Sequence, residues 1–373
     1  MRIAHISDCY LPRTGGIETQ VRALAMQQLA QGDEVRIITA TPGGTTRSGV
    51  EVIDRIPVER ITARIPGDLP IHPRTRAHVL EALKRNPVDV VHVHVGVISP
   101  FAWGAVRAAH RLRLPVLVTV HGIWGPLAGP GYRLSDVLTH WSKWGVQLSA
   151  VSEVAARRIE HALPGVGRVL VLPNGIDPML WLLPQRQHDS ATLNIVTVMR
   201  LAPRKRTLPL LKIMQAARNR VGPRVHLQLR IVGDGPERTR AEAFVGQHGL
   251  SDAVTFTGRL DHGGIREVFA MSDVYVQASV RESFGIAALE ARSAGLPVVA
   301  RAQTGTAQFI RHQHEGLLAD NDAEMAIALA RLATDRPLLE QLSAHNREYP
   351  PEQAWPRVLE LVGEAYAQAR ALD

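Results

Sequence analysis

Short apolar stretches alternate with segments of helical periodicity along the whole chain. In its first half the pattern predicts strands at residues 3–7, 35–39, 88–93, 116–120, 147–151 and 169–172. A helix that ends near Gly32 is expected between the first two strands, since apolar residues recur there at helical spacing, namely Ile17, Val21, Leu24, Ala25 and Leu29. Strands that alternate with helices are typical of parallel βαβ units whose sheet is covered on both faces.

Residues 172–194 break this alternation. The segment is rich in Pro, Asn, Gly and Asp, as expected of a linker, and a second series of strands follows it at 195–198, 225–232, 254–257, 274–277 and 297–300. A chain of 373 residues is also too long for one ordinary core. We therefore predict two doubly wound, Rossmann-like α/β domains, residues 1–175 and 176–350, that face a central cleft. Ligands of such sheets bind outside the carboxyl ends of the strands.

The composition narrows the class of protein. Cys9 is the only cysteine, which excludes an internal disulfide framework and a cysteine-based zinc cluster and suits a reducing compartment. Residues 1–7 lack the apolar core of a signal peptide, and no run approaches the roughly 18 apolar residues of a membrane-spanning helix. A cytoplasmic location is therefore expected.

The net charge of +8 lies almost entirely in the first half. Residues 1–173 hold 20 Lys and Arg against 13 Asp and Glu, whereas residues 174–373 hold 23 against 22. A basic half fits a nucleic acid, an anionic membrane or a phosphorylated ligand, and also simple solubility. We expect no nucleic-acid partner, because aromatic residues make up only 5% and no basic run is interleaved with them.

Several common phosphate and metal motifs are absent. The chain has no G-x-x-x-x-G-K and no H-E-x-x-H, and "GDGPER" (233–238) has Arg238 where a dinucleotide fingerprint has its third glycine. His92 and His94 alternate on a predicted strand and so share a face, but no third ligand is evident nearby. We therefore predict no bound metal, and favour a histidine that lines a cleft.

Two stretches near predicted strand ends could bind an anion. In "YLPRTGGIETQV" (10–21), Gly15 and Gly16 allow close backbone approach beside a helix N-terminus, although a plain turn explains them equally well. In "VMRLAPRKRTLPLL" (198–211), Arg200 and Lys205 suit a diphosphate. The cluster at 204–206 leaves a solvated basic loop as the alternative.

The stretch "RESFGIAALE" (281–290) combines both kinds of group. Glu282 precedes a Ser-Phe-Gly turn, and Glu290 lies in the second turn of a helix expected over 286–292. The two carboxylates can accept hydrogen bonds from hydroxyls, while the free N–H groups of residues 283–286 can accept an anion. A sugar nucleotide carries both complementary parts, hydroxyls at its two ends and a diphosphate between them.

These stretches, in this order, resemble the retaining glycosyltransferases of the GT-B fold, and family 4 in particular. The resemblance covers nearly the whole chain. It rests on "P-x-x-G-G-I-E" after the first strand, "DVVHVH" (89–94), "TVHG" (119–122), "VSE" (151–153), "LPNGID" (172–177), "RLAPRK" (200–205), "IVGDGPE" (231–237) and the E-x7-E stretch with the Pro-Val-Val that follows it (282–299).

The resemblance assigns roles in the second domain. It implies that Arg200 and Lys205 hold the donor diphosphate, that Glu282 accepts hydroxyls of the transferred sugar and that Glu290 binds the ribose. The backbone of the turn and helix start would touch sugar and phosphate, through Ser283, Phe284, Gly285 and Ile286.

For the first domain, the resemblance implies that Gly16, after Gly15, allows close approach of the diphosphate or acceptor. His121 would line the cleft near the reacting sugar. The last helix, residues 351–373 with its start near Trp355, would cross back onto the first domain.

The implied reaction moves a hexose (mannose, glucose or N-acetylglucosamine) from a UDP- or GDP-linked donor, with retention. The acceptor would be a hydroxyl of a glycan, a lipid-linked or a phosphorylated molecule. No cofactor is expected, because Arg200, Lys205 and the helix N-terminus would stabilise the leaving diphosphate. Glu282 could instead be a nucleophile by analogy with retaining glycosidases, but the resemblance argues for binding of hydroxyls. A sugar-nucleotide epimerase or hydrolase, and a non-catalytic sugar-nucleotide-binding protein, remain alternatives.

The sequence departs from the family pattern at three places. Arg206 stands where glycine is usual, "QTGTAQFI" (303–310) replaces the commoner Gly-Gly-x-x-Glu loop, and Ala278 replaces a common proline.

Residues 69–85 combine an apolar loop with basic residues on a predicted helix, namely Arg74, Arg76, Lys84 and Arg85. This combination fits contact with the inner face of an anionic membrane, and equally a solvated helix face.

Overall fold

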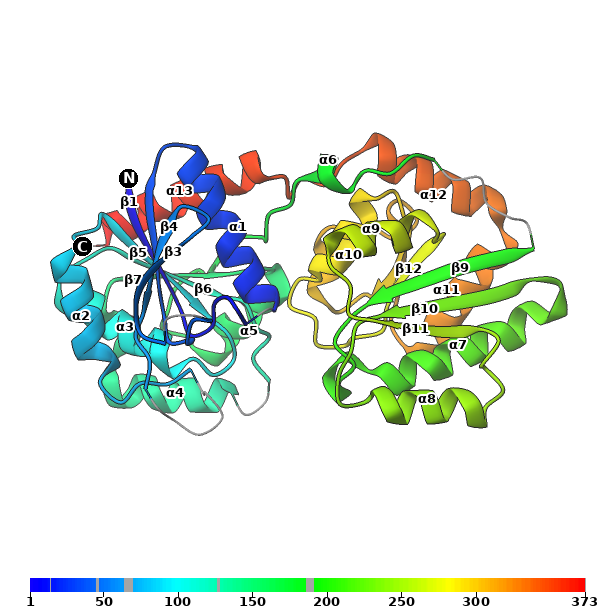
Figure 1. Ribbon diagram of the computed structural model, residues 1–373, viewed down its shortest axis with the longest axis horizontal. Helices are drawn as coiled ribbons and strands as arrows, with labels where there is room; N and C mark the ends of the chain where they lie inside the picture. The colour runs from blue at the N-terminus through cyan, green and yellow to red at the C-terminus, as the bar shows by residue number, and fades with distance from the viewer. Residues whose placement is uncertain (14, 45–46, 64–69, 126–127, 186–190, 373) are drawn as a thin grey trace. The chain divides into compact units, whose positions relative to one another are not determined.

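A computed structural model describes the chain except residues 14, 45–46, 64–69, 126–127, 186–190 and 373 (Figure 1). The chain divides into two compact units, which we call unit 1 (Met1–Gly175 with Trp355–Asp373) and unit 2 (Ile176–Ala354). Each unit is a mainly parallel sheet with helices on both faces. The predicted fold class, two doubly wound α/β domains, is confirmed.

Unit 1 is built on an eight-stranded sheet in the order β3-β4-β2-β1-β5-β6-β7-β8. Its strands are β1 (Arg2–Ser7), β2 (Glu34–Thr39), β3 (Gly49–Ile53), β4 (Ile56–Arg60), β5 (Val90–Val95), β6 (Val116–Val120), β7 (Val146–Ala150) and β8 (Leu170–Val171). All neighbours pair in parallel except β3 and β4, which form an antiparallel hairpin at the edge. We did not predict this hairpin, because its two-residue turn is formed by Asp54 (φ 52°) and Arg55 (φ 68°) in place of the usual glycine or asparagine.

The helices of unit 1 cover both faces of that sheet. One face packs against α1 (Gly16–Ala30) and the C-terminal α13 (Trp355–Ala371) through Ile3, Val90 and Leu117. The other face carries the alternate strand residues, such as Ala4 and Val91, and is covered by α2 (Thr75–Arg85), α3 (Pro100–Arg111) and α5 (Glu153–Ala162). α4 (Ala128–Thr139) and the short helix η2 (Trp141–Lys143) follow β6 (Figure 1).

Unit 2 has a six-stranded parallel sheet in the order β11-β10-β9-β12-β13-β14. The strands are β9 (Thr192–Val198), β10 (His226–Val232), β11 (Val254–Gly258), β12 (Val274–Gln277), β13 (Val298–Arg301) and β14 (Gly316–Ala319). The last strand was not predicted, because four residues are too few to show a period. The helices are α6 (Pro178–Trp181), α7 (Thr207–Val221), α8 (Arg238–Gln247), α9 (His262–Ala270), α10 (Ile286–Ser293), α11 (Asp322–Thr334) and α12 (Arg336–Glu348).

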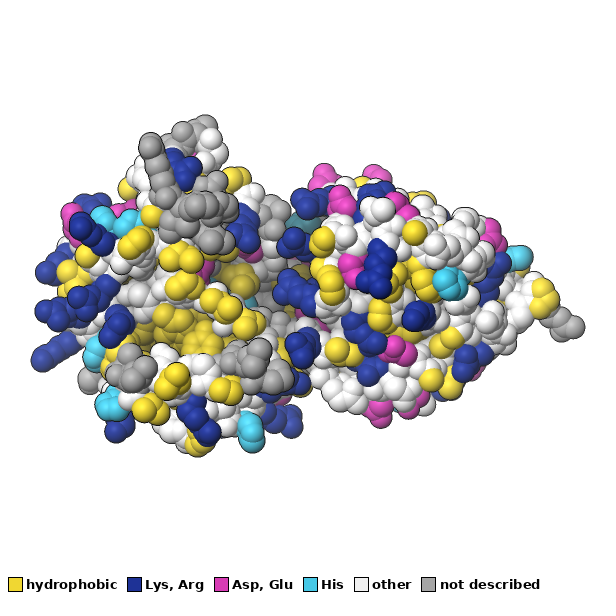
Figure 2. Space-filling model, turned by 90° about the horizontal axis from the view of Figure 1, so that it is seen from below, with side chains coloured by type: hydrophobic (Ala, Val, Ile, Leu, Met, Phe, Trp, Pro, Cys, Tyr) yellow, Lys and Arg dark blue, Asp and Glu magenta, His cyan; other side chains and the backbone are white. Residues whose placement is uncertain are grey.

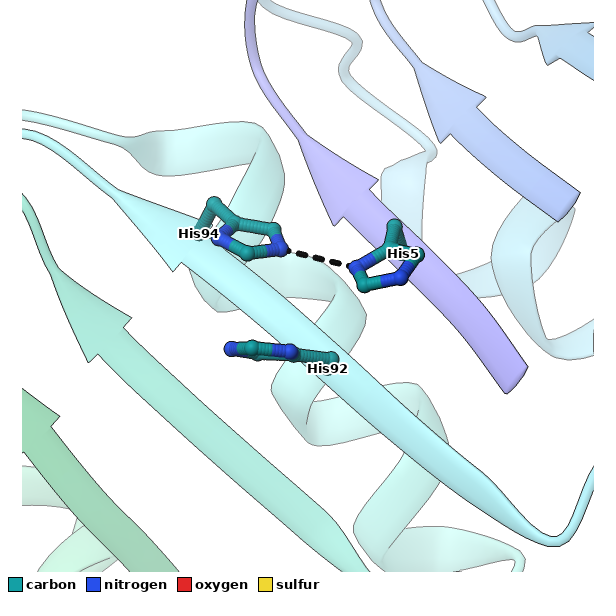
Figure 3. A group of neighbouring side chains, drawn as sticks. All are labelled: His5, His92 and His94. Carbon is teal, nitrogen blue, oxygen red and sulfur yellow. Dashed lines mark hydrogen bonds between the residues drawn. The ribbon is translucent and has the colours of Figure 1, made fainter. Parts of the chain in front are cut away.

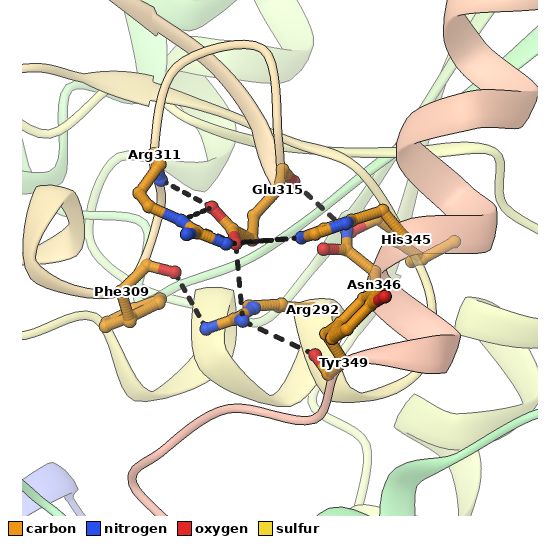
Figure 4. A network of polar contacts seen from close by, with 8 residues as sticks. Arg292, Phe309, Arg311, Glu315, His345, Asn346 and Tyr349 are labelled. Atoms are coloured by element: carbon orange, nitrogen blue, oxygen red, sulfur yellow. Dashed lines mark hydrogen bonds and ion pairs between the residues drawn. The ribbon is translucent and has the colours of Figure 1, made fainter.

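A buried carboxylate fastens α10 to α12 in unit 2 (Figure 4). Glu315, only 1% exposed, accepts hydrogen bonds from the backbone N of Arg311 at 2.7 Å and from Nε2 of His345 at 3.1 Å, and lies 3.6 Å from Arg292 of α10. Burial alone would raise the pKa of Glu315, but the hydrogen bonds from Arg311 and His345 outweigh it and lower the pKa to about 2. This network holds the C-terminal end of α10, the helix that carries Glu290.

Within the described residues, no helix is both long enough and apolar enough to cross a membrane.

Candidate functional site

The loop from β12 to α10 places the two glutamates as the sequence predicts, one before the helix and one within it. Gly285 precedes the helix with φ +98°, a left-handed conformation that favours glycine. A Cβ atom there would lie 2.6 Å from Oγ1 of Thr306, so a larger residue would also clash. The helix then begins at Ile286, and its first N–H groups have no partner within the helix.

Glu282 forms an ion pair with Lys205. The Nζ–Oε2 distance is 2.5 Å, and the Lys205 and Glu282 side chains are 25% and 12% exposed. Lys205 ends the short helix η3 (Pro203–Lys205) in the loop after β9, so two neighbouring strands of the sheet supply the pair. The structure thus brings together two residues that the sequence analysis assigned to one donor site.

Arg200 follows β9 and is exposed, and it forms no ion pair or side-chain hydrogen bond with a described residue. Its neighbours are fixed by the backbone of the "GDGPE" loop: Met199 N donates to Val232 O at 2.9 Å and Leu201 N to Asp234 O at 3.0 Å. A Cβ atom on Gly233 would lie 1.9 Å from Met199 O. The Gly-x-Gly that fails as a dinucleotide fingerprint therefore packs against the loop that carries Arg200.

Glu290 is half-buried and unpartnered. Burial raises the pKa of its carboxyl to about 8, and no described residue forms a hydrogen bond or an ion pair with it. Sequence reasoning missed Tyr275 of β12, whose pKa is raised by burial and also by the charges of both Glu282 and Glu290. The carboxylate of Glu290 is thus partly withdrawn from water and has its acceptor capacity free.

The departing loop at 303–310 still closes on the turn before α10. Gly305 N donates to Glu282 O at 2.9 Å, and Thr306 Oγ1 donates to Phe284 O at 3.2 Å. A Cβ atom on Gly305 would lie 2.0 Å from Ser283 O. Phe284 is fully buried against Phe309, with ring centroids 5.2 Å apart, so its side chain belongs to the core and only its backbone is available to a ligand.

Arg206 shows why glycine is expected at its position. Its φ is +63°, in the left-handed region that glycine adopts most easily. Its guanidinium donates to the carboxylate of Asp322 at 2.7 and 3.0 Å, an ion pair that anchors the residue in this conformation.

In unit 1, Gly15 precedes α1 in an extended conformation (φ −168°) and Gly16 is the first residue of the helix. Extended backbone is open to any residue, so the conformation does not require glycine at position 15. Oγ1 of Thr19 donates to Gly15 O at 2.9 Å, which leaves the first N–H groups of α1 at the carboxyl edge of the sheet.

His121 follows β6 at this same edge and continues into a buried row of histidines (Figure 3). His94 joins His121 through Nδ1 and Nε2 at 3.0 Å, and joins His5 through Nε2 and Nδ1 at 2.9 Å. His5 lies beside His92 in register, because β1 and β5 are neighbouring parallel strands. The third histidine that the sequence analysis did not find is therefore His5, which is distant in sequence and adjacent in the sheet.

The histidine row is neutral and satisfied by protein groups. Burial lowers the pKa of His5 and His121 to about 4 and that of His92 and His94 well below its usual value. Ligand atoms of His5, His92 and His94 lie within 4.8 Å of one another, as a metal site requires. However, every ring nitrogen of these three is already hydrogen-bonded, so a metal ion would have to displace several of these bonds.

Unit 1 also holds an apolar pocket of about 630 Å³, between α3, α4 and η2. Its lining includes Val97, Ile98, Trp103, Tyr132, Trp141 and Trp144. Nε1 of Trp103 donates to the Tyr132 hydroxyl at 3.0 Å, and that hydroxyl donates to Val97 O at 3.1 Å. The polar atoms of these aromatic side chains are thus used internally, and the pocket presents apolar surface. Figure 2 shows a hydrophobic hollow on this part of unit 1, with Lys and Arg side chains to one side.

Basic residues adjoin the pocket. Arg76, Arg107 and Arg111 line a neighbouring hollow with Trp144, and Arg107 stands 5.7 Å over the Trp144 ring. None of the three arginines forms an ion pair with a described residue. By contrast Arg85, from the predicted basic helix, is paired with Glu59 and Glu81. The exposed charge of this region is therefore shared between α2 and α3.

Comparisons with known proteins agree with this geometry. The family model "Glycosyl transferases group 1" matches residues 184–349, and "Glycosyltransferase Family 4" matches residues 14–180. The GDP-mannose-dependent alpha-(1-6)-phosphatidylinositol monomannoside mannosyltransferase of Mycobacterium tuberculosis is 30% identical, over 71% of this chain and 72% of its own. A phosphatidylinositol N-acetylglucosaminyltransferase of Arabidopsis thaliana is 25% identical in its matching polypeptide, over 93% of this chain and 77% of that polypeptide.

Solved structures share the fold across the whole chain. Anabaena Alr3699/HepE in complex with UDP aligns with a TM-score of 0.76 at 19% identity, over 100% of both chains. Together these matches define a glycosyltransferase of the GT-B type that uses a nucleotide sugar. The chain belongs to glycosyltransferase family 4, as its motifs predict.

Proposed function

We propose that this protein is a retaining hexosyltransferase that needs no metal ion. It transfers mannose, glucose or N-acetylglucosamine from UDP or GDP to a hydroxyl of a glycan, lipid-linked or phosphorylated acceptor. The observation that carries the proposal is the Lys205–Glu282 pair, which lies directly before the free N-terminus of α10.

The donor fits unit 2 group by group. The unpaired Arg200, the ammonium of Lys205 and the N–H groups at the start of α10 bind the diphosphate and stabilise the charge that develops as it leaves. Glu282 accepts hydrogen bonds from sugar hydroxyls, and the unpartnered Glu290 accepts them from the ribose. Because these cations supply positive charge at the diphosphate, the reaction does not require a divalent ion.

In the transfer itself, the acceptor oxygen bonds to the anomeric carbon while the bond from that carbon to the β-phosphate oxygen breaks. The hydroxyl proton leaves with the diphosphate. Attack and departure occur on the same face of the sugar, which retains the configuration without a covalent intermediate. Glu282 does not serve as the nucleophile in this scheme, since its carboxylate is engaged by Lys205 at 2.5 Å.

A panel of UDP- and GDP-sugars and their free diphosphates, measured by thermal shift on the full chain, tests donor binding. One nucleotide series should raise the melting temperature. Proton NMR of the purified product then tests retention, with an α-linked donor expected to give an α-linked product. Free diphosphate released without an acceptor would favour the epimerase or hydrolase alternative, and binding without turnover would favour the non-catalytic one.

For the acceptor we propose a lipid-linked molecule at the inner face of an anionic membrane, which places the enzyme in the cytoplasm. The apolar pocket beside Arg76, Arg107 and Arg111 supports this proposal, because apolar surface next to unpaired cations suits the interface of an anionic bilayer. Two relatives also carry phosphatidylinositol in their names.

A further inference from the structure

The buried histidines of unit 1 belong to one unbroken chain of side-chain hydrogen bonds. The chain begins at a backbone carbonyl, that of Val118, which can only accept. Ser149 Oγ donates to this carbonyl at 3.3 Å and must therefore accept from Thr119 Oγ1, 2.7 Å away. Thr119 in turn accepts from Nε2–H of His92 at 2.7 Å, which leaves Nδ1 of His92 without a proton.

The second half of the chain runs through the two helices that cover this face of the sheet. Because Nδ1 of His92 is an acceptor, the Tyr366 hydroxyl of α13 donates to it at 2.9 Å. Tyr366 then accepts from the amide Nε2 of Gln28 on α1, at 3.0 Å. This fixes the amide orientation of Gln28, whose Oε1 is left to accept from Nε2–H of His5 at 2.6 Å.

The remaining links follow from that orientation. Nδ1 of His5 must accept from Nε2–H of His94, and Nδ1 of His94 must accept from Nε2–H of His121. His5, His92 and His94 are fully buried, whereas His121 is partly exposed. Nδ1 of His121 is the end of the chain and carries an unprotonated lone pair.

We infer that Tyr366 and Gln28 are positioning residues that fix His121 in its Nε2–H tautomer, so that Nδ1 can only accept a hydrogen bond. The partner of His121 is then a substrate hydroxyl and not an anionic oxygen, which has no proton to donate. This conclusion deepens the proposed function and rests on it for the identity of the hydroxyl. The tautomer itself rests on the hydrogen-bond chain alone.

The tautomer can be measured without any turnover. Long-range 1H–15N correlation spectra of the full chain, labelled with 15N-histidine and compared with His121→Gln, should show a pyridine-type Nδ1 and a pyrrole-type Nε2 for His121. Tyr366→Phe removes one oxygen from the centre of the chain and frees the Gln28 amide to turn over. The His121 nitrogens should then move toward averaged shifts.

Tyr10→Phe is the matched control, since the Tyr10 hydroxyl is buried in the same unit and has no hydrogen-bond partner. It should leave the His121 signals and turnover unchanged. Thr119→Val interrupts the chain at its other half and should act like Tyr366→Phe, which covers the case in which one variant does not fold.

Activity gives a second readout that separates positioning from donor binding. Tyr366→Phe should lower kcat by threefold to tenfold while the affinity for the free nucleoside diphosphate stays as in the wild type. A protonated Nδ1 on His121 in the wild type, or unchanged His121 shifts in both chain variants, would overturn the inference. A failure of the proposed function would appear instead as absent donor binding with the histidine spectra as expected.

Discussion

Lys205 and Glu282, 77 residues apart in the chain, hold each other at 2.5 Å before the start of α10. In the absence of donor, the group proposed to bind diphosphate is therefore neutralised by the group proposed to bind sugar. A bound donor supplies a partner for each, so the pair links recognition of the two parts of one molecule.

Glu282→Gln should uncouple these two roles. The amide keeps the shape of the side chain but cannot neutralise Lys205, so the affinity for free nucleoside diphosphate should be maintained or increased. The weaker hold on the sugar hydroxyls and the altered charge should lower kcat by on the order of 100-fold. Calorimetry with the free diphosphate and steady-state kinetics measure the two effects.

Glu242→Gln is a suitable control, because Glu242 forms an exposed ion pair with Arg238 on α8 and should be silent. Detection of a glycosyl–enzyme adduct in either the wild type or Glu282→Gln by mass spectrometry would contradict the assignment of Glu282 as a hydroxyl-binding residue.

Donor affinity should depend on pH through Glu290. The pKa of its carboxyl is about 8 in the free protein, and the ionised form is the better acceptor for ribose hydroxyls. Affinity should therefore rise with pH up to about 8 and level off above it, by at most about tenfold per unit. Titrations of the nucleoside diphosphate from pH 6 to 9 measure the profile. Glu290→Gln should bind more weakly at high pH and lose this dependence, and a profile unchanged by the substitution would assign it to another group.

Glu315 should contribute to stability only above acid pH. Its pKa is about 2 in the folded chain against an ordinary value of 4.5, so the unfolded state takes up the proton first as pH falls. The stabilisation is complete above about pH 4.5 and is lost as pH falls toward 2. Glu315→Gln should cost on the order of 3 kcal/mol near neutral pH, because it leaves Arg292 buried without its partner.

Urea denaturation at several pH values measures this contribution. The exposed pair Arg357–Glu360 provides the control, and Glu360→Gln should change the free energy of unfolding by less than about 1 kcal/mol. Equal effects of the two substitutions would argue against the network in Figure 4 as a fastening of α10.

The histidine row should make unit 1 sensitive to a milder acid range. The pKa of His5 is lowered to about 4 in the folded state against 6.5, so the unfolded chain binds more protons between these values. Stability is present above about pH 6.5 and is lost as pH falls toward 4, at up to about 1.4 kcal/mol per pH unit for each buried histidine. Denaturation between pH 7.5 and 4.5 should show this slope, and His92→Gln should reduce it. A flat profile would show that the row is not neutral and buried in solution.

Much of the architecture could be predicted because it depends on local pattern. The alternation of strands and helices gave the fold class, and the Ser-Phe-Gly turn predicted a helix start at Ile286 that the structure has. The hairpin β3–β4 escaped because Asp54 and Arg55 take positive φ without the usual residues.

The site was harder to predict where it depends on register between distant strands. Glu282 and Glu290 could be assigned from one contiguous stretch. The pairing of His5 with His92 follows from β1 lying next to β5, and the direct contact of Lys205 with Glu282 from β9 lying next to β12. The apolar pocket draws on α3, α4 and η2 together, so no single stretch of sequence indicates it.

The full chain should bind anionic vesicles through this pocket and the arginines beside it. Vesicles of phosphatidylglycerol and phosphatidylcholine (30:70) should co-sediment it, and pure phosphatidylcholine should not. The double variant Arg107→Glu, Arg111→Glu should weaken binding at least tenfold, since each cation near such a surface contributes about 1 kcal/mol. Ile98→Asp tests the apolar part, because Ile98 is 85% exposed and lines the pocket.

The matched controls lie in unit 2: Arg240→Glu removes an exposed arginine of α8, and Ile327→Asp an exposed isoleucine of α11. Both should bind vesicles like the wild type. Brominated lipids should quench tryptophan fluorescence in the wild type but not in Ile98→Asp, because Trp103, Trp141 and Trp144 line the pocket. Binding that is indifferent to anionic lipid and to salt would refute the membrane proposal and leave the basic half of the chain as a solvated surface.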